Sequence, residues 1–564
     1  MFILESPSKA KTISYILKKI NIRKFKIVAT RGHIKDLPKN NLGFKIEKDK
    51  IVPFFNFLPG KKRIIDYIKK LLGQYNYVIL ATDPDREGEA IAFHVYSELS
   101  NGLASNFKEN SQQKLNFKRA FINEITLNGV KKGLENLSEI NLSMVESQLA
   151  RRIIDRVIGY KISPVLWRSF KIKGLSAGRV QTATLKILVQ REKEIENFKP
   201  KKYFTIKINF KINEYNLSAY LYGKNGDLFK VFNKEEVKNL ENSFLKKIVG
   251  KLFEFEMNEG VKEIIPPDPL KTSTLQQEAA KIGIPNSLTM KIAQKLYEGV
   301  FIGKEKRGLI TYHRTDSVRV SQEGIELAKK ILGNVRVYSR KNKSAFDAHE
   351  AIRITYPFSL SLLRKYLSDE EFKIYELIYR RFLASLYLPC EYAYNEIICC
   401  LSQDFYIKYQ AGKVLKEGFL KILPQEIEKY KIFKNTFVDC SERFLKIIDY
   451  EIEENHTKPP PRYTLSSIIR KMEEVGIGRP STYASTIETL KKRKYIQVKK
   501  GVIVVTELGK KVLEFLDKGY SDLLDVEFTA LMENFLDEIE ASDISTAKKF
   551  CYQKIWEIYQ RLRN

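Results

Sequence analysis

Short apolar runs alternate with amphipathic segments in the N-terminal part of the chain, and this alternation limits the possible folds more than any other feature. Residues 2–4 form an apolar run, the turn ESPS follows, and residues 9–20 have helical periodicity. Strands that alternate with helices form a parallel sheet covered by helices. The expected elements are strands at 2–4, 25–30 and 75–81 and helices at 9–20, 61–73 and 87–99. The sequence therefore predicts an α/β domain here.

The rest of the chain changes its pattern more than once. Helical periodicity returns in long stretches, and segments that alternate in the manner of strands separate these stretches. The expected helical stretches are 126–196, 271–388 and 464–564; strands are expected near 203–212, 217–232 and 392–410, a hairpin near 495–506 and a polar surface loop at 100–114. Because similar patterns flank a different one, we expect the chain to leave domains and return to them, as in a ring or clamp.

The charge of the chain favours a polyanionic partner. Lysine and arginine number 98 and aspartate and glutamate 68, so 98 − 68 = +30, and the pI is near 9.5. Such a surplus attracts nucleic acid. The alternative is a lysine-rich surface that reflects biased composition.

Cysteine usage and apolar runs indicate the compartment. Five cysteines are too few for a disulfide framework, and no CxxC pair is present, so we expect no zinc ribbon. Acid, proline and lysine follow soon after Met1, which argues against a signal peptide. No apolar run reaches the roughly 18 residues of a membrane-spanning helix. We expect a soluble, cytoplasmic protein without a membrane partner.

An acidic motif lies where a strand meets a helix. The string YVILATDPDREGEAIAFH places Asp83, Asp85 and Glu87 after an apolar run, and Glu5 and Lys9 follow the first strand. Alternate residues of an extended segment project to the same side, and open α/β sheets bind ligands at the carboxyl ends of their strands. Carboxylates gathered there repel one another without a cation, and oxygen donors favour Mg²⁺. The alternative is simple capping of the helix by an aspartate.

A second motif offers a nucleophile. In GLITYHRTDSVRVS (308–321) an apolar run precedes Tyr312, and Arg314 lies two residues further on. A phenol with a pKa of about 10 is a poor nucleophile unless a cation or a base activates it. Arg314 would project to the same side of an extended backbone and could stabilise both phenolate and phosphate. By itself, one tyrosine among 30 would be weak support.

Basic side chains recur on helices and at helix starts. Arg152 and Arg156 share one helix face, although Asp155 could neutralise them. In SAGRVQTATL (176–185), Arg179 lies at a helix start, which is a good place for a phosphate. The string GIGRPSTYAST (476–486) repeats the arrangement near the C-terminus. Cations interleaved with tyrosines suit backbone tracking and base stacking.

These motifs together resemble one family. ESPSKAKTI followed by ATDPDREGEAIAFH resembles the Toprim metal domain of type IA DNA topoisomerases, and the string around Tyr312 resembles their active-site motif. His313 stands where bacterial members often have Met, and Ile354, in AHEAIRIT, stands where the family has Pro. The resemblance runs from about residue 2 to about 545, and LYEGVFIG looks more like bacterial topoisomerase I than reverse gyrase.

The resemblance implies a role for each matching residue. The implied catalytic residues are Tyr312, Arg314, Glu5, Lys9 and His349, and the implied Mg²⁺ ligands are Glu5, Asp83, Asp85 and Glu87. The implied DNA-binding residues are His33, Arg151, Arg152, Arg156, Tyr160, Arg179, Gln181, Arg353, Arg479, Ser481 and Thr482. A lone histidine such as His349 is otherwise more often structural than catalytic.

The implied architecture is a multidomain α/β and α+β protein in which a Toprim domain, helical domains and a β-rich domain form a toroidal clamp. We expect the Toprim domain at 1–36 and 60–135, a helical DNA-groove domain at 37–59, 136–200 and 456–564, a β-rich hinge or arch at 201–265 and 390–455, and a helical domain carrying the nucleophilic tyrosine at 266–389. Because the acids and Tyr312 are far apart in sequence, the active site should form where two domains meet.

The expected activity is ATP-independent relaxation of negatively supercoiled DNA through a 5′-phosphotyrosine, strand passage and religation. The expected partners are single-stranded and negatively supercoiled DNA. We expect the protein to be a monomer that is associated with the nucleoid. The alternatives are a Toprim nuclease or primase, the topoisomerase subunit of a split reverse gyrase, and a non-catalytic DNA-binding protein. No GxxxxGK[ST] loop is present, so a helicase function would require a separate ATPase.

Overall fold

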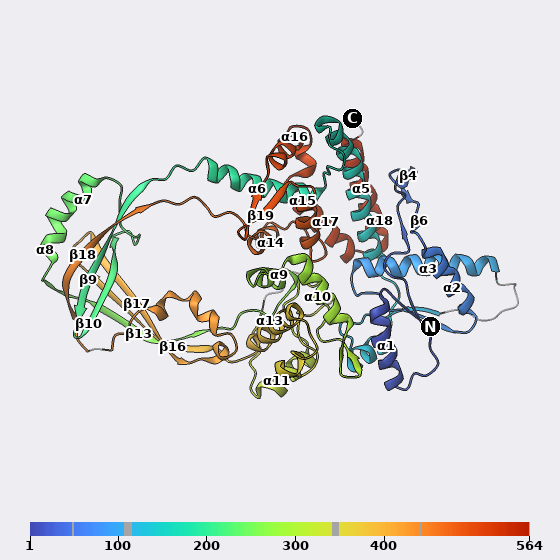
Figure 1. Cartoon of the computed structure of the whole chain (residues 1–564), viewed down its shortest axis with the longest axis horizontal. Coiled ribbons are helices and arrows are strands. Elements are labelled where there is room, and N and C mark those ends of the chain that lie inside the picture. The colour runs from blue at the N-terminus through green and yellow to red at the C-terminus, as the bar shows by residue number, and fades with distance from the viewer. Residues whose placement is uncertain (48–49, 107–115, 341–348, 440, 563–564) are drawn as a thin grey trace.

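The chain closes into a ring in the view of Figure 1. This computed structural model describes residues 1–564 except 48–49, 107–115, 341–348, 440 and 563–564. A β-rich part lies at one side of the ring, two long arms connect it to the helical parts, and the two ends of the chain lie at the opposite side.

The N-terminal part is a parallel sheet covered by helices, as the alternation predicts. Its four strands have the order β2-β1-β7-β8, and all three pairings are parallel. Ile65 and Ile68 cover one face, and Ile13 and Leu17 cover the other. The elements are β1 (Phe2–Leu4), α1 (Pro7–Lys19), β2 (Ile27–Ala29), α2 (Lys61–Leu72), β7 (Tyr77–Leu80), α3 (Arg86–Asn106), β8 (Asn116–Arg119) and α4 (Leu127–Glu135).

Two expectations for this part are wrong in detail. Residues 100–106 continue helix α3 and are not loop, while 107–115 lie outside the described residues. Because α3 begins at Arg86, Glu87 belongs to the first helical turn and does not continue an extended run with Asp83 and Asp85. The period changes from two to 3.6 within the motif, yet Asp85 and Glu87 still both contact Arg314.

The segment between β2 and α2 forms two small hairpins. Strand β3 (Lys35–Asp36) pairs with β6 (Asn56–Phe57), and β4 (Phe44–Glu47) pairs with β5 (Lys50–Pro53). Leu37 and Phe44 of this segment belong to the hydrophobic core of the helical part, which is described next.

A helical part gathers segments from distant places in the sequence around one hydrophobic cluster. Its longest helix, α5, carries Pro164 in its interior. The hairpin expected near 495–506 is confirmed. The elements are α5 (Leu142–Phe170), α6 (Arg179–Glu196), α14 (Leu465–Glu474), α15 (Tyr483–Lys492), β19 (Ile496–Lys499), β20 (Val502–Val505), α16 (Glu507–Leu524), α17 (Val526–Ala541) and α18 (Ile544–Arg561).

The β-rich part is one antiparallel sheet with the strand order β12-β18-β9-β10-β17-β16-β13, and β11 pairs with β9. Short helices complete it. The strands are β9 (Lys202–Ile212), β10 (Tyr215–Gly223), β11 (Lys230–Val231), β12 (Leu252–Glu254), β13 (Glu256–Ile264), β16 (Cys390–Cys400), β17 (Phe405–Lys416) and β18 (Phe444–His456), with α7 (Lys234–Leu240), η1 (Glu241–Leu245), α8 (Lys246–Ile248), η2 (Gly418–Lys421), η3 (Pro424–Lys429) and η4 (Lys431–Lys434).

The remaining part carries Tyr312 and shares a hydrophobic core with the N-terminal sheet. One cluster includes Ile16 and Ile122 from the sheet domain and Leu296 and Ile310 from this part. The hydroxyl of Tyr297 donates to the carbonyl of Ile122 at 2.5 Å across the same contact. The elements are α9 (Thr272–Lys281), α10 (Asn286–Glu298), β14 (Val300–Ile302), β15 (Glu305–Arg307), α11 (Gln322–Leu332), α12 (Leu360–Leu363) and α13 (Asp369–Ser385).

Candidate active site

The acidic motif lies at the carboxyl edge of the parallel sheet. Strands β1 and β7 are neighbours, with Ile3 opposite Leu80, so Glu5 and Asp83 both lie just beyond this edge. Asp85 caps α3 by accepting a hydrogen bond from the Gly88 amide at 2.8 Å, so the capping interpretation is correct for this residue.

Asp83 has a buried cation as its partner, whereas Glu5 lies near two other carboxylates. Lys9 is fully buried and donates to Asp83 at 3.1 Å and to the carbonyl of Ala81 at 3.2 Å. Burial, followed by the charges of Asp83 and Asp85, raises the pKa of Glu5 to about 8. Glu5 therefore retains its proton at neutral pH in this arrangement, because it is buried and two like charges lie nearby.

Tyr312 lies against these acids. Its ring is 2% exposed, and its hydroxyl donates to Asp85 Oδ2 at 2.5 Å. Its amide donates to the carbonyl of Asn123 at 2.7 Å, which fixes this segment on the sheet domain. Burial, then the charge of Asp85, raises the pKa of Tyr312 well above 10, so the phenol is neutral here. The structure thus brings together the two motifs that are far apart in sequence.

Arg314 extends from the same segment to the same acids. Its Nη1 lies 3.3 Å from Asp85 Oδ2 and 3.1 Å from Glu87 Oε2, and the side chain is 30% exposed. Burial opposes ionisation of Asp85, but Arg314 and the hydrogen bond from Tyr312 outweigh it and lower the pKa of Asp85 below its usual value. Asp85 therefore contacts both Tyr312 and Arg314.

The acids are occupied by protein cations and by the phenol. Among the described residues, no group of three or more His, Cys, Asp or Glu side chains is arranged to hold a metal ion. The donors nevertheless fit a hard divalent cation, because all are carboxylate oxygens and Glu5 lies close enough to Asp83 and Asp85 to be affected by their charges.

Three histidines surround the phenol and the acids. The rings of His313 and His349 each lie 5.5 Å from that of Tyr312. Burial, with a contribution from Arg314, lowers the pKa of His313 to about 3, so this histidine is neutral and part of the packing. Burial also lowers the pKa of His33, which lies near Glu87 and Asp85.

Several of the expected DNA-groove arginines contact carboxylates of α17. Buried Glu533 is within ion-pair distance of Arg151, Arg179 and Arg479, and Asp537 accepts from Arg479 at 2.6 Å. Arg179 is 1% exposed, so the expectation that its side chain is available at an open helix start is wrong. The guanidinium instead satisfies a buried carboxylate.

The other expected groove residues have varied environments. Arg353 is buried between Glu350 and Glu124, so its expected exposure to DNA is also wrong. Arg152 pairs with Asp36. The remaining groove residues have local contacts: Arg156 with the Pro38 carbonyl and the Tyr160 ring, Gln181 with Ser176, and Thr482 with Arg479, while Ser481 is exposed.

Sequence reasoning missed the residues that hold the acidic turn. Arg119 and Glu89 form a fully buried ion pair at 2.7 Å. Arg119 also donates to the carbonyls of Thr82 and Asp83 at 3.1 and 2.7 Å, which fixes the backbone between the strand and α3. A lone arginine on a short strand carries no sequence signal for this role.

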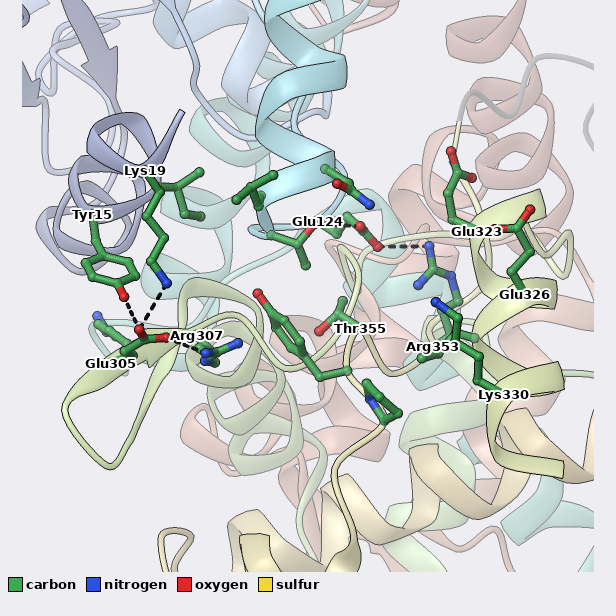
Figure 2. A pocket seen from close by; sticks show the side chains of 18 residues that line it. Tyr15, Lys19, Glu124, Glu305, Arg307, Glu323, Glu326, Lys330, Arg353 and Thr355 are labelled. Atoms are coloured by element: carbon green, nitrogen blue, oxygen red, sulfur yellow. Dashed lines mark hydrogen bonds and ion pairs between the residues drawn. The ribbon is translucent and has the colours of Figure 1, made fainter. Parts of the chain in front are cut away.

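A separate pocket of about 340 Å³ lies where α1 and α4 face the hairpin β14–β15, α11 and residues 353–357. Figure 2 shows Tyr15 and Lys19 of α1 converging on Glu305 of the hairpin. Lys306 donates to the carbonyl of Ser8 at 2.9 Å. These contacts join the sheet domain to the part that carries Tyr312.

The chain is similar to known proteins over almost its whole length. A family model described as DNA topoisomerase matches residues 139–550, and a Toprim domain model matches residues 1–125. Among the described residues, no helix has both the length and the apolar character required to cross a bilayer.

Curated relatives and a solved structure agree with these matches. DNA topoisomerase 1 of Thermotoga maritima is 41% identical over 554 residues, which are 95% of this chain and 81% of the relative. DNA topoisomerase 1 of Campylobacter jejuni is 37% identical over 570 residues, covering 98% and 78%. The solved full-length topoisomerase I of Thermotoga maritima superposes with a TM-score of 0.83 at 39% identity, covering all of this chain and 90% of that one. A nuclease or primase with a Toprim domain would account for the N-terminal match alone. The chain belongs to the bacterial type IA DNA topoisomerases.

Proposed function

We propose that this topoisomerase relaxes negatively supercoiled DNA without ATP, with Tyr312 as the nucleophile. The observation that carries the proposal is the 2.5 Å hydrogen bond from the Tyr312 hydroxyl to Asp85, which joins the tyrosine motif to the acidic motif. A buried phenol beside carboxylates and an arginine has what phosphoryl transfer requires: a nucleophile, a proton acceptor and a cation.

The proposed chemistry exchanges one phosphodiester for another. The Tyr312 oxygen attacks a backbone phosphate, the bond to the 3′-oxygen breaks, and a 5′-phosphotyrosine and a free 3′-hydroxyl result. Asp85 is placed to accept the phenolic proton, and Arg314 to stabilise the added negative charge on phosphate. The 3′-hydroxyl later reverses the step. Because bond energy is retained, supercoil strain can drive the net reaction without nucleotide hydrolysis.

We propose Lys9 and His349 as further phosphate contacts and Mg²⁺ as the cofactor. Lys9 would reach the phosphate from the side of Asp83, and His349 from the other side of the phenol ring. The residues that would hold the cation are Glu5, Asp83, Asp85 and Glu87. When bound, the cation would neutralise phosphate charge beside these acids. The groove residues Arg152, Arg156, Arg479 and Ser481 are proposed to track single-stranded DNA in a monomeric enzyme.

The test uses Tyr312→Phe with negatively supercoiled plasmid and Mg²⁺. We expect no relaxation and no covalent adduct after denaturation, whereas the wild type should relax the plasmid and leave protein on the 5′ end. Tyr375→Phe is the matched control, since Tyr375 is a buried tyrosine of α13 in the same part of the chain. Relaxation by Tyr312→Phe at the wild-type rate would show that another group is the nucleophile.

Chelation gives a second readout. With EDTA we expect plasmid relaxation to stop while cleavage of a single-stranded oligonucleotide persists, because the cation is needed more for resealing than for attack. Full relaxation in EDTA would contradict a role for Mg²⁺.

A further inference from the structure

A cluster of exposed cations lies on the helical part, outside the acidic site. Two segments form it: the loop after α5 and the turn and hairpin after α15. We call it the basic platform; its members are Arg168, Lys171, Lys173, Lys492, Arg493, Lys494, Lys499 and Lys500, all exposed except the partly buried Arg493. Arg493 Nε donates to Ser176 Oγ at 3.1 Å, and the Tyr495 hydroxyl donates to the Ser176 carbonyl at 3.0 Å, so the two segments are in contact.

Ion pairing distinguishes the platform cations from the groove arginines. Within the described part of the chain, no carboxylate forms an ion pair with any of the eight. The groove arginines differ, because Arg151, Arg179 and Arg479 all pair with carboxylates of α17. A cation that neutralises nothing inside the fold is available to an external anion, and at this density that anion is a polyanion.

Three platform lysines also lie in an unfavourable backbone conformation. Lys171, Lys494 and Lys500 have φ of 56°, 60° and 47°. Only six non-glycine residues in the described chain have positive φ, and two of the other three are Asn21 and Asn213, a residue type that tolerates this region. Glycine would relieve each lysine position, so these three charges can be removed without a steric cost.

The platform is joined through Ser176 to one residue of the expected DNA groove. Ser176, which contacts Arg493, is also hydrogen-bonded to Gln181: its Oγ lies 3.1 Å from Gln181 Oε1, and its carbonyl accepts from Gln181 Nε2 at 3.0 Å. Gln181 is one of the DNA-binding residues that the resemblance implies. Through Ser176, Gln181 is therefore adjacent to the platform.

We infer that the basic platform binds the phosphate backbone of the duplex DNA that adjoins the cut single strand. This inference rests on the proposed strand cleavage, since a single-stranded region in supercoiled DNA is bounded by duplex. The hairpin is a two-stranded ribbon with Lys499 and Lys500 at its tip, a shape that fits a groove of B-form DNA. Trp167 is the one exposed aromatic side chain of the two segments, at 41%, and its indole N–H donates to the Leu175 carbonyl, so a row of stacking residues for single strands is not present there.

The test replaces the three strained lysines together, Lys171→Gly, Lys494→Gly and Lys500→Gly, in a Tyr312→Phe background so that binding is measured without cutting. We expect the melting temperature to stay the same or rise, because glycine suits these backbone angles. The affinity for a hairpin oligonucleotide with a duplex beside a single strand should fall by about tenfold or more, with a salt slope smaller by about 3. The affinity for a single-stranded oligonucleotide should change less than about twofold.

Two controls complete the design. The Lys→Arg triple variant at the same positions keeps the charge and should retain the affinity for the junction. Lys224→Gln, Lys238→Gln and Lys251→Gln remove the same charge from the β-rich part and should leave the preference for the junction unchanged. An equal loss for both oligonucleotides, or no loss for the junction, would overturn the inference. Either result leaves the nucleophile test with Tyr312 intact, because no covalent step enters this measurement.

Discussion

At the scale of single residues, Asp85 connects the two halves of the active site. It caps α3, accepts the hydrogen bond of Tyr312 and contacts Arg314. Its carboxylate keeps the phenol fixed but also raises the pKa of Tyr312, so this closed arrangement favours a neutral nucleophile. Binding of a phosphate beside Arg314 would change the pKa of Tyr312, because Arg314 would then interact with the phosphate as well as with Asp85.

His94 should make folding stability depend on pH. Burial, followed by the charges of His33 and Lys35, lowers the pKa of His94 to about 4 from an ordinary value of 6.5. The unfolded chain therefore takes up this proton near pH 6.5, and the folded chain takes it up only near pH 4. The contribution of His94 to the free energy of unfolding is therefore fully present above pH 6.5 and declines as the pH falls toward 4. The difference corresponds to about 3 kcal/mol.

We expect His94→Phe to remove this decline, since the ring lies 4.7 Å from Phe55 and its Nδ1 has no hydrogen-bond partner in the described part of the chain. Urea unfolding at pH 7.5 and pH 5 measures it, with His456→Gln as the control. A wild-type loss of stability that persists unchanged in His94→Phe would contradict the assignment.

The sequence predicted which residues gather at the site better than it predicted what they contact. The motifs around Asp83 and Tyr312 are local strings, so their positions follow from the chain itself. The partner of Arg179 is Glu533, on a helix near the other end of the chain. Nothing local distinguishes an arginine that faces DNA from one that satisfies a buried carboxylate, because both lie on amphipathic helices.

At the scale of elements, the junction of β7 and α3 determines the geometry of the acids. A Cβ on Gly88 would lie 2.0 Å from the carbonyl oxygen of Asp83, so only glycine lets the helix begin directly after the acidic turn. Arg119 stabilises the same turn by donating a hydrogen bond to the carbonyl of Asp83. The strand and helix periods predicted this junction, but the length of α3 was underestimated because polar residues at its end resemble a loop.

Gly88→Ala should therefore displace the acidic turn. We expect a loss of at least about 2 kcal/mol in the free energy of unfolding and a large loss of oligonucleotide cleavage, because the added methyl meets backbone and not a flexible side chain. Gly73→Ala is the control: its φ is −62°, and nothing lies within 4 Å of the added Cβ. That variant should be neutral or stabilised by up to about 1 kcal/mol. Wild-type cleavage by Gly88→Ala would disprove the steric argument.

At the scale of the whole molecule, the candidate active site forms at a contact between two parts of the ring. The sheet domain supplies the acids, and the part with α10 and the hairpin β14–β15 supplies Tyr312. The ring in Figure 1 agrees with the clamp that the sequence pattern suggested. We propose that strand passage requires this contact to separate after the cut.

The contacts of the hairpin β14–β15 with α1 should regulate this separation. Glu305→Gln with Lys306→Met removes the ion pair with Lys19, weakens the contact with Tyr15 and removes the hydrogen bonds to Ser8. We expect the cleaved state to open more often, so the fraction of enzyme trapped on DNA by denaturant should rise severalfold.

The control for this prediction is Glu514→Gln with Lys518→Met, which removes an exposed ion pair within α16. That double variant should trap no more enzyme than the wild type. An equal rise in both double variants would assign the effect to general destabilisation and not to the hairpin.

The hydrophobic cluster that the two parts share has a thermal consequence. Separating them would bring side chains such as Ile16, Ile122 and Leu296 into water, and apolar hydration increases the heat capacity. The equilibrium between closed and parted states should then vary with temperature along a curve and not a straight van't Hoff line. Cooling weakens apolar association. If the ionic contacts between the two parts are unchanged, the sheet domain should therefore separate from the part that carries Tyr312 more readily in the cold.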